Sequence, residues 1–309
     1  MIFLPDVDML LSGGLRDWLD AKAAERSEAK KQMFTAGFAG AGAALAVVLL
    51  AFTFNLFPFG YFIAALVFGG GLWWANSIRQ KMVNQLKQEM NGALAHAMGI
   101  SYSVEAIGGD EFTTACTFDL LPSYDDANLQ DNWQGEVGGT PFTLYEAELT
   151  EQRGSGKDRH TVTVFQGIVI RLRFARDFTG TTLLRREGFK FTWFGDSKSF
   201  NDQKLERIKM VDPAFEAAFD VYGSDPVEAR YLVHPAYCER LLELEREFNG
   251  AKLSALFYHG DVIVTIHTDD MFESATLNPD EDRERLGMTI RQFGSLVKLI
   301  TLLNERPRG

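Results

Sequence analysis

A few short stretches of this chain contain residue types that could do chemistry, and the first of them is GSGK, residues 154–157. Glycines and a lysine in such a stretch can surround a nucleotide phosphate, but that loop requires Gly-x4-Gly-Lys-Ser/Thr between a strand and a helix. Here Glu151 stands in place of the first glycine, Asp158 follows Lys157, and strand patterns lie on both sides. GSGK therefore predicts a hairpin loop.

The five histidines and two cysteines are the residues most suited to binding a transition metal. His259 lies at a predicted turn and His267 lies at the far end of the following strand. At about 3.4 Å per residue they are more than about 20 Å apart, too far for metal bonds of about 2 Å. His234 is near Cys238 in sequence, but Pro235 places it outside the helix that contains the cysteine. We expect no metal site and no cofactor.

Motifs of nucleophilic catalysis are also missing from the sequence. There is no Gly-x-Ser-x-Gly turn, and the abundant acidic residues fall in stretches typical of solvated faces or helix starts. Cys116 and Cys238 are too few for a disulfide framework. One bridge between them is an alternative, and we favour free thiols in a reducing compartment. We expect a protein that is not an enzyme, with a hydrolase of unrecognised site as the alternative.

One segment of the acidic C-terminal part, residues 171–190, has a basic excess. Its basic residues are Arg171, Arg173, Arg176, Arg185, Arg186 and Lys190. One hypothesis is a face for an acidic partner or for anionic lipid headgroups, worth about 1 kcal/mol per charge near the membrane surface. The alternative is an outer sheet face that neighbouring acids balance.

These basic residues lie within a predicted sheet. Residues 140–149, 159–165 and 167–176 alternate apolar with polar side chains and are rich in β-branched and aromatic types, which predicts strands. In the third stretch, Ile168 and Ile170 share one face, and Val169 and Arg171 share the other. We expect one buried face, and we expect residues 195–204 to be a polar linker.

Beyond residue 211 the pattern alternates between helices and strands. Asp212 and Pro213 begin a short helix, Pro235 begins a longer one, and residues 283–304 form the last helix. His259 and Gly260 join two strands as a hairpin. We therefore expect a β-rich subdomain over residues 101–211 and an α+β subdomain over residues 212–309.

The net charge also divides the chain. The formal charge is -11 at pH 7, and residues 100–309 contain 23 basic and 35 acidic residues against 8 and 7 in residues 1–99. Nucleic-acid binding requires clustered basic residues, so no nucleic-acid partner is expected.

No charged residue occurs between Lys31 and Arg79. One helix over residues 32–78 would be roughly 70 Å long at about 1.5 Å per residue, whereas the hydrocarbon core of a bilayer is about 30 Å thick. Pro58 disfavours helix at Phe57, and Gly60 tolerates a turn. The run therefore predicts two membrane spans, residues 33–57 and 59–78, with a hairpin tip at Pro58.

The residues flanking this hairpin predict its orientation. Basic residues precede the first span and follow the second, so the positive-inside rule places both termini in the cytoplasm. Pro58 at the tip, and Trp73 and Trp74 before Arg79, are the expected membrane-interface residues. Residues 1–31 predict an N-terminal cytoplasmic helix, and residues 79–99 predict an amphipathic stalk helix that Gly99 can end.

Small residues recur four apart in the first span, with Ala36 before Gly40 and Gly37 before Ala41. Such spacing lets helix backbones approach closely in lipid. One hypothesis is a homo-oligomer interface. The alternative, which we favour, is packing between the two spans of one hairpin, with residues 69–71 facing this stripe.

The segment from VDPAFEAAF to TDDMFE resembles a bacterial membrane-protein family catalogued as domain of unknown function three-one-three-seven. The matching residues are Phe215, Glu216, Phe219, Asp225, Val227, Glu228, Ala229, Arg230, Tyr231, Phe272 and Glu273. With GEVGGTPFTLYEAEL, FQGIVIRLRFARDFTG and the preceding hairpin, the resemblance covers most of residues 33–275. It implies a two-span, cytoplasm-facing protein, often encoded near LemA-type membrane proteins, with no assigned catalytic residues.

Within that motif, Glu228 and Arg230 are expected to form a structural ion pair, with a functional pair as the alternative.

The fold class we predict is a membrane protein with a two-helix transmembrane hairpin and a cytoplasmic α+β domain whose sheet is mainly antiparallel. We predict a scaffold, accessory or regulatory subunit in the bacterial inner membrane. Its partners would be the lipid bilayer and a membrane protein, and a LemA-type protein is the candidate that the resemblance suggests.

Overall fold

The computed structural model describes residues 3–54, 57–174, 177–186, 197–200, 203–210, 212–235, 237–239, 241–242 and 252–304. The chain forms two compact units. A helical unit comprises residues 5–94 and 273–288, and a sheet unit comprises residues 1–4, 95–272 and 289–309. The helices α3 (Phe57–Met98) and α8 (Asp282–Asn304) contribute residues to both units.

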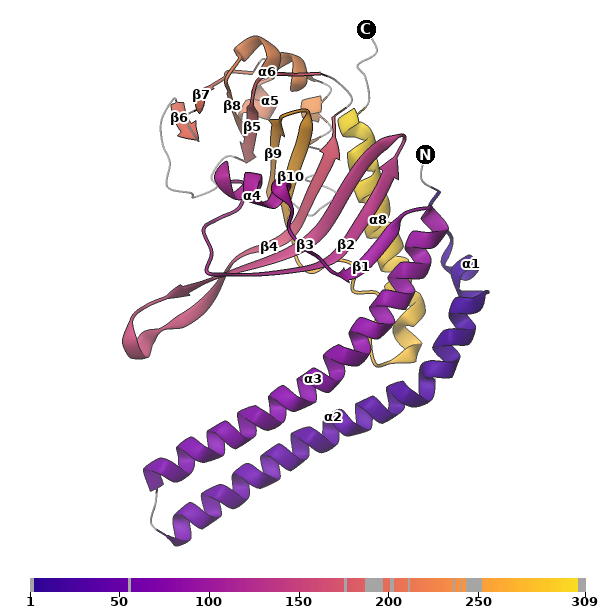
Figure 1. The fold of residues 1–309 in the computed structure, drawn as a ribbon, viewed down its shortest axis with the longest axis vertical. Helices are drawn as coiled ribbons and strands as arrows, with labels where there is room; N and C mark the ends of the chain where they lie inside the picture. Colours follow the sequence, from indigo (N-terminus) through magenta and orange to yellow (C-terminus); the bar gives the residue numbers. More distant parts are fainter. Residues whose placement is uncertain are drawn as a thin grey trace. The chain divides into compact units, whose positions relative to one another are not determined.

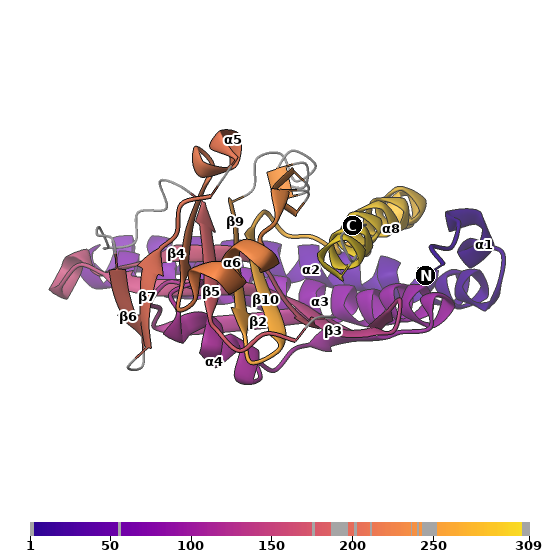
Figure 2. The ribbon, with the colours of Figure 1, turned by 90° about the horizontal axis from the view of Figure 1, so that it is seen from above.

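Two long antiparallel helices dominate the helical unit, α2 (Gly14–Thr53) and α3 (Figures 1 and 2). A short helix, α1 (Val7–Leu11), precedes them. The break between Thr53 and Phe57 confirms that the uncharged run forms two helices, with Pro58 in the first turn of α3. Proline is tolerated there because the N–H groups of a first turn have no partner within the helix.

The two helices pack against each other through glycine. A Cβ atom added to Gly40 would lie 2.8 Å from the Cα of Gly71, and one added to Gly71 would lie 2.6 Å from the Cα of Gly40. Gly37, Gly69 and Gly70 have no such neighbour within 4 Å. Gly40 of the small-residue stripe therefore packs within the hairpin, and of residues 69–71 only Gly71 makes this contact.

Most of the side chains of this hairpin are exposed. Only 17% of the most apolar 18-residue window is buried in each helix. The large exposed apolar residues along the hairpin are Phe34, Phe38, Leu45, Leu49, Leu50, Phe52, Phe54, Phe59, Tyr61, Phe62, Ile63, Leu66, Phe68, Leu72, Trp73 and Trp74. By length and composition, α2 and α3 are the two described helices that could cross a membrane.

In the last part of α3, where the sequence predicts an amphipathic stalk helix, the apolar face is covered. Val83, Leu86, Met90 and Leu94 are buried, three of them with no exposed surface. The apolar stripe of this segment is therefore packed inside the protein, because a stripe at helical spacing gains stability from leaving water.

The sheet unit contains ten described strands in the order β1-β2-β3-β4-β10-β9-β5-β8-β7-β6 (Figure 1). They are β1 (Ser101–Glu105), β2 (Asp126–Val137), β3 (Thr140–Arg153), β4 (His160–Arg173), β5 (Thr182–Arg186), β6 (Ser197–Phe200), β7 (Gln203–Arg207), β8 (Phe219–Gly223), β9 (Lys252–Tyr258) and β10 (Asp261–His267). Each described pairing is antiparallel. This confirms the antiparallel sheet that the sequence predicts.

The strand order corrects three expectations. The predicted strands 159–165 and 167–176 are one strand, β4. The predicted polar linker, residues 195–204, contains β6 and the first two residues of β7, and these strands form a hairpin. The predicted boundary at residue 211 does not divide the sheet into two subdomains, because β10 pairs with β4 and β5 pairs with both β8 and β9. Hydrogen bonding between these strands merges the two expected subdomains into one sheet.

Both faces of the sheet are buried at its centre, rather than one. Ile170 is fully buried on one face and Val169 on the other. On the Val169 face, Ala115 of α4 (Asp110–Thr117) joins the core. On the opposite face, the Phe293 ring of α8 lies 4.9 Å from that of Trp133. Helices on both sides explain why β4 contains a continuous apolar run.

Two short helices cover the end of the sheet near β8. Asp212 accepts hydrogen bonds from two backbone N–H groups and begins α5 (Pro213–Glu216), as the sequence predicts. Asp225 does the same for α6 (Pro226–Leu232). The predicted turn at His259 and Gly260 joins β9 to β10, and Gly99, with φ of 73°, follows the end of α3.

Candidate functional site

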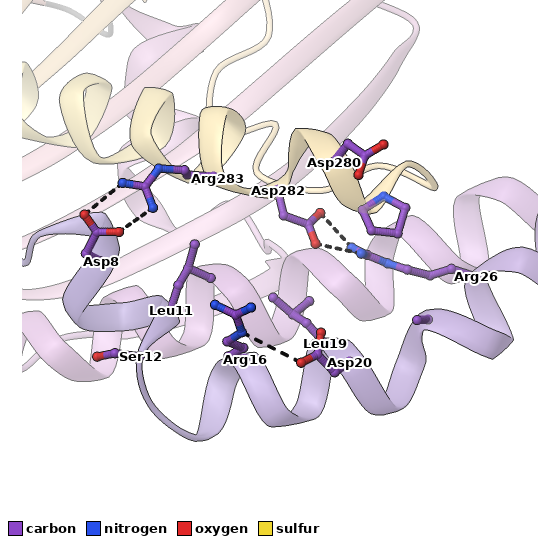
Figure 3. A pocket seen from close by; sticks show the side chains of 12 residues that line it. Asp8, Leu11, Ser12, Arg16, Leu19, Asp20, Arg26, Asp280, Asp282 and Arg283 are labelled. Atoms are coloured by element: carbon purple, nitrogen blue, oxygen red, sulfur yellow. Dashed lines mark hydrogen bonds and ion pairs between the residues drawn. The ribbon is translucent and has the colours of Figure 1, made fainter.

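The helical unit contains a pocket of about 620 Å³ (Figure 3). Three segments line it: α1 with the turn after it, the first turns of α2, and the turn that begins α8. Its residues are Asp8, Leu11, Ser12, Arg16, Leu19, Asp20, Ala23, Arg26, Pro279, Asp280, Asp282 and Arg283. All of them belong to the helical unit.

Local structure determines how these segments begin. Asp6 accepts a hydrogen bond from the Asp8 N–H at 2.7 Å and caps α1. Asn278 accepts from the Asp280 N–H at 3.4 Å and caps the single turn η2 (Pro279–Glu281) that precedes α8. In α2, positions 16, 19, 20, 23 and 26 line the pocket, which is the spacing of one helix face. One stripe of α2 and two capped turns therefore build the site.

The deepest charged group of the pocket is Arg26. Its side chain is 1% exposed, and its guanidinium donates to both carboxylate oxygens of Asp282 at 2.6 and 2.9 Å. Two parallel hydrogen bonds of this kind are the strongest geometry for an arginine–carboxylate pair. Because each charge would be costly to bury alone, this pair fixes α2 against the start of α8 (Figure 3).

A second pair closes the pocket at its outer side. Arg283 donates to both carboxylate oxygens of Asp8, with 2.8 Å between Nη2 and Oδ2. Both side chains are exposed, at 63% and 68%. The hydrogen bond from Arg283 holds the pKa of Asp8 below its ordinary value, so this carboxyl stays ionised near neutral pH. It acts as an ion-pair partner and not as a proton donor.

Three charged residues of the pocket, Arg16, Asp20 and Asp280, remain available to a ligand. The Nε of Arg16 lies 3.8 Å from Asp20, beyond hydrogen-bond distance, and its side chain is 69% exposed. The carboxylate of Asp280 is exposed and has no ion-pair partner among the described residues. Between them, Leu11 and Leu19 supply apolar surface. This arrangement suits binding of a group that is partly apolar and partly charged.

The pocket was not apparent from the sequence. Its α2 stripe has helical spacing, but the other side comes from residues more than 250 positions away. In the sequence, the one indication of this pocket is the acidic cluster NPDED before the last helix, and such clusters are common at helix starts. Within the described ranges, no group of three or more His, Cys, Asp and Glu side chains could hold a metal ion.

The aromatic residues of the predicted family motif lie in the sheet unit. The rings of Phe215 and Phe219 stack with 5.0 Å between centroids, and both side chains are buried. Tyr231, on α6, is 57% exposed. The two phenylalanines are therefore core residues that attach α5 to β8.

Residues 163–305 match the model of a family described as "Protein of unknown function (DUF3137)". This part of the chain is similar to that family. The match begins later than the sequence resemblance suggests and extends through α8. The two long helices lie outside it, so the two-span arrangement and the association with LemA-type proteins remain expectations.

Other comparisons add little to the DUF3137 assignment. No curated protein matches the chain. One similar solved structure is the crystal structure of the mycobacterial trehalose monomycolate transport factor A, TtfA. It is 12% identical, with a TM-score of 0.35, and the alignment covers 73% of this chain and 98% of that one.

Within the DUF3137 region, the expected ion pair between Glu228 and Arg230 is wrong. Glu228 accepts hydrogen bonds from the backbone N–H groups of Thr179 at 2.9 Å and Gly180 at 2.5 Å. Arg230 donates to the carbonyl of Lys209 at 3.3 Å. Both side chains bind backbone groups of neighbouring loops, so Glu228 and Arg230 each fix a different loop.

The predicted basic face is not one surface. Arg171 pairs with Asp261 at 2.7 Å, and Arg173 lies 3.5 Å from the same carboxylate. Arg185 is buried, and burial lowers its pKa to about 10. Arg186 donates to the Ala218 carbonyl at 2.9 Å.

The other residues of the predicted basic face either lie outside the described residues or are buried. Arg176 and Lys190 lie outside the described residues. The Arg185 guanidinium donates to the carbonyl of Phe118 at 3.2 Å, at the C-terminal end of α4. A buried arginine cannot contact a membrane surface, so Arg185 is a core residue.

The predicted membrane-interface residues are all exposed. Trp73 is 74% exposed and Trp74 57%, and Pro58 is exposed at the start of α3. Their exposure is compatible with contact with lipid. The two cysteines are free thiols, as the sequence predicts.

Proposed function

We propose that this protein is a membrane-anchored accessory or regulatory subunit of an assembly in the bacterial inner membrane, with no catalysis of its own. In this proposal the hairpin of α2 and α3 is the anchor. The sheet unit and the pocket are cytoplasmic and act by binding.

The observation that carries the proposal is the exposed apolar surface of the hairpin. Phenylalanine, leucine and tryptophan side chains are exposed on both helices over the run that contains no charge. Contiguous apolar surface of this size is unfavourable in water, and each helix is long enough to span a hydrocarbon core of about 30 Å. The hydrocarbon core of a lipid bilayer provides the apolar surroundings that this surface requires.

Basic residues support the orientation. Lys22, Arg26, Lys30 and Lys31 precede the first span, and Arg79, Lys81 and Lys87 follow the second. Lysine and arginine favour the cytoplasmic side. Both termini would then be cytoplasmic, with Pro58 near the outer surface.

The chemistry of the pocket supports a binding role. Its buried arginine and the aspartate facing it neutralise each other, and Asp8 is held ionised by Arg283. Acid–base catalysis instead needs a group whose pKa lies near the working pH. Lipid sensing by the basic segment is not proposed, because Arg185 is buried and Arg171 is paired.

Native mass spectrometry of the protein, extracted gently from its own membrane, tests the accessory role. We expect a species heavier than the 34.6 kDa chain that contains at least one other polypeptide. By family resemblance, a LemA-type protein is the first partner to look for. A species made only of this chain, in repeated extractions with different mild detergents, would contradict the proposal.

A further inference from the structure

The strands β3 and β4 extend past their neighbours and form a two-stranded arm (Figure 1). The ladder between β2 and β3 ends at Thr150, and the ladder between β10 and β4 ends at Gly167. Beyond these points, Glu151–Arg153 pair only with His160–Val162 among the described strands. The outer edge of β4, residues 160–165, is therefore without a neighbouring strand in the described sheet.

A β-bulge separates this arm from the rest of the sheet. Leu149 pairs with Phe165, but the next residue, Thr150, pairs with Thr163, so Val164 is the extra residue. Bulges bend a strand and increase its twist. Residues 160–163 form the regular part of the outer edge, with Thr161 and Thr163 exposed and Val162 half-buried.

Apart from the bulge at Val164, this edge lacks the devices that usually prevent strand addition. Natural edges are blocked by charged residues, by proline or by a covering element. Residues 160–165, HTVTVF, contain no lysine, arginine, acid or proline. Free N–H and C=O groups on such a strand are a template for another strand.

The sequence of the edge fits a second copy of this chain as the occupant, because Thr161 and Thr163 lie symmetrically about Val162. The chain has a net charge of -11, and residues 100–309 have most of the acidic excess, so most surfaces of two copies repel each other. The edge of β4 is uncharged, so two copies can approach there. Antiparallel pairing about Val162 would place Thr161 opposite Thr163 of the second copy and Val162 opposite its equivalent, pairs that stabilise sheets.

We propose that the β4 edges of two copies pair antiparallel, centred on Val162, and form a four-stranded sheet from two arms. Such a contact is small compared with the roughly 1,200 Å² or more that stable interfaces bury. Confinement to one membrane raises the effective concentration of the two copies and offsets this weakness. That last step rests on the proposed anchoring.

Disulfide cross-linking of the full-length chain in membrane vesicles tests the pairing. In the proposed register, two Val162→Cys residues have Cα atoms about 4.5–5.5 Å apart, within the range of a disulfide. We expect a cross-linked dimer with Val162→Cys. Gln152→Cys, exposed on the opposite edge of the arm, is the matched control, and the unaltered chain gives the background of Cys116 and Cys238.

The register of the pairing between the two β4 edges can be tested by mixing two variants. Chains with Thr161→Cys and chains with Thr163→Cys should cross-link to each other more than either does to itself. Adding Val162→Lys to both chains places like charges opposite each other and should abolish this product, whereas adding Gln152→Lys should not.

Two results would overturn the pairing: no dimer at any position from 160 to 163, or equal dimer with Gln152→Cys. Pelleting of the same vesicles separates this inference from the anchoring. Cross-linked chains that wash off the membrane would support the pairing and contradict the anchor, and chains that stay in the pellet without cross-linking would do the reverse.

Discussion

Individual charged residues in the helical unit differ in what they stabilise, according to how deeply they are buried. The Arg26–Asp282 pair is almost fully enclosed, the Lys87–Glu273 pair at 2.7 Å has one enclosed partner, and the Asp8–Arg283 pair is exposed. Removing one partner of a buried pair leaves an uncompensated charge, whereas exposed pairs contribute little. Arg26 is therefore the residue whose loss should damage the unit most.

Replacing Arg26 with methionine should lower the free energy of unfolding by about 3–5 kcal/mol, because Asp282 would remain buried without its partner. Thermal unfolding in mild detergent would measure the loss. Arg16→Met, which removes an exposed pair with Asp20, is the control and should change stability by less than about 1 kcal/mol.

The double variant, Arg26→Met with Asp282→Leu, sharpens this test. Since it removes both charges and keeps apolar volume, it should recover most of the stability. A double variant as unstable as Arg26→Met alone would show that the pair contributes through something other than charge compensation.

Acid should release α1 from the start of α8. The folded-state pKa of Asp8 lies below its ordinary value of 3.8 because of Arg283. A depressed carboxyl pKa stabilises the folded state above the unfolded pKa, and this contribution is lost as pH falls through the folded pKa. Hydrogen exchange of residues 7–11, corrected for its intrinsic pH dependence, should rise below about pH 4.

The matched variant for this measurement is Asp8→Asn, which should show the faster exchange already at neutral pH. Exchange in the unaltered chain that stays constant down to pH 3 would mean that the Asp8–Arg283 pair does not hold α1.

At the scale of elements, features with local causes could be predicted from the sequence and features with distant causes could not. Pro58 breaks the helix, and His259-Gly260 makes a turn, whatever the rest of the chain does. In contrast, β2 has the polar sequence DANLQDNWQGEV and becomes a strand because β1 and β3 pair with it. Its Trp133 is fully buried, which no alternating pattern indicated.

The candidate pocket could not be predicted for the same reason. Glu273, Asp282 and Arg283 lie close together in sequence, yet they pair with α3, α2 and α1 respectively. Their partners are 186, 256 and 275 positions away. From the sequence alone, many other acidic and basic residues could equally have formed ion pairs. Only the folded structure shows that these three pairs form.

Helix packing in the hairpin gives an element-scale prediction. Gly71→Ala should destabilise the hairpin by about 1–3 kcal/mol, because its Cβ would overlap the backbone of Gly40 and force the helices apart; the overlap distance is 2.6 Å. Thermal unfolding in detergent would measure it.

Gly70→Ala is the matched control, since it has open space around it. Alanine there should stabilise the helix by up to about 1 kcal/mol. Equal effects of the two substitutions would contradict the close approach of Gly40 and Gly71.

For the whole molecule, the proposed function requires that the hairpin lies in a membrane. The helical unit exposes apolar residues along α2 and α3, whereas its pocket and ion pairs involve polar groups near the N-terminus and at residues 273–288. Deleting residues 33–78 should therefore move the protein from the membrane pellet to the soluble fraction. A deletion variant that still pellets, without aggregating, would place the anchor elsewhere in the chain.

The topology of the hairpin can be measured by labelling single added cysteines with a membrane-impermeant maleimide in sealed vesicles of both orientations. Phe59→Cys reports on the exposed tip of the hairpin, and Gln152→Cys reports on an exposed position of the sheet unit. In the proposed topology, we expect the tip to react only from the periplasmic side and the sheet position only from the cytoplasmic side. Reaction of both positions from the same side would contradict it.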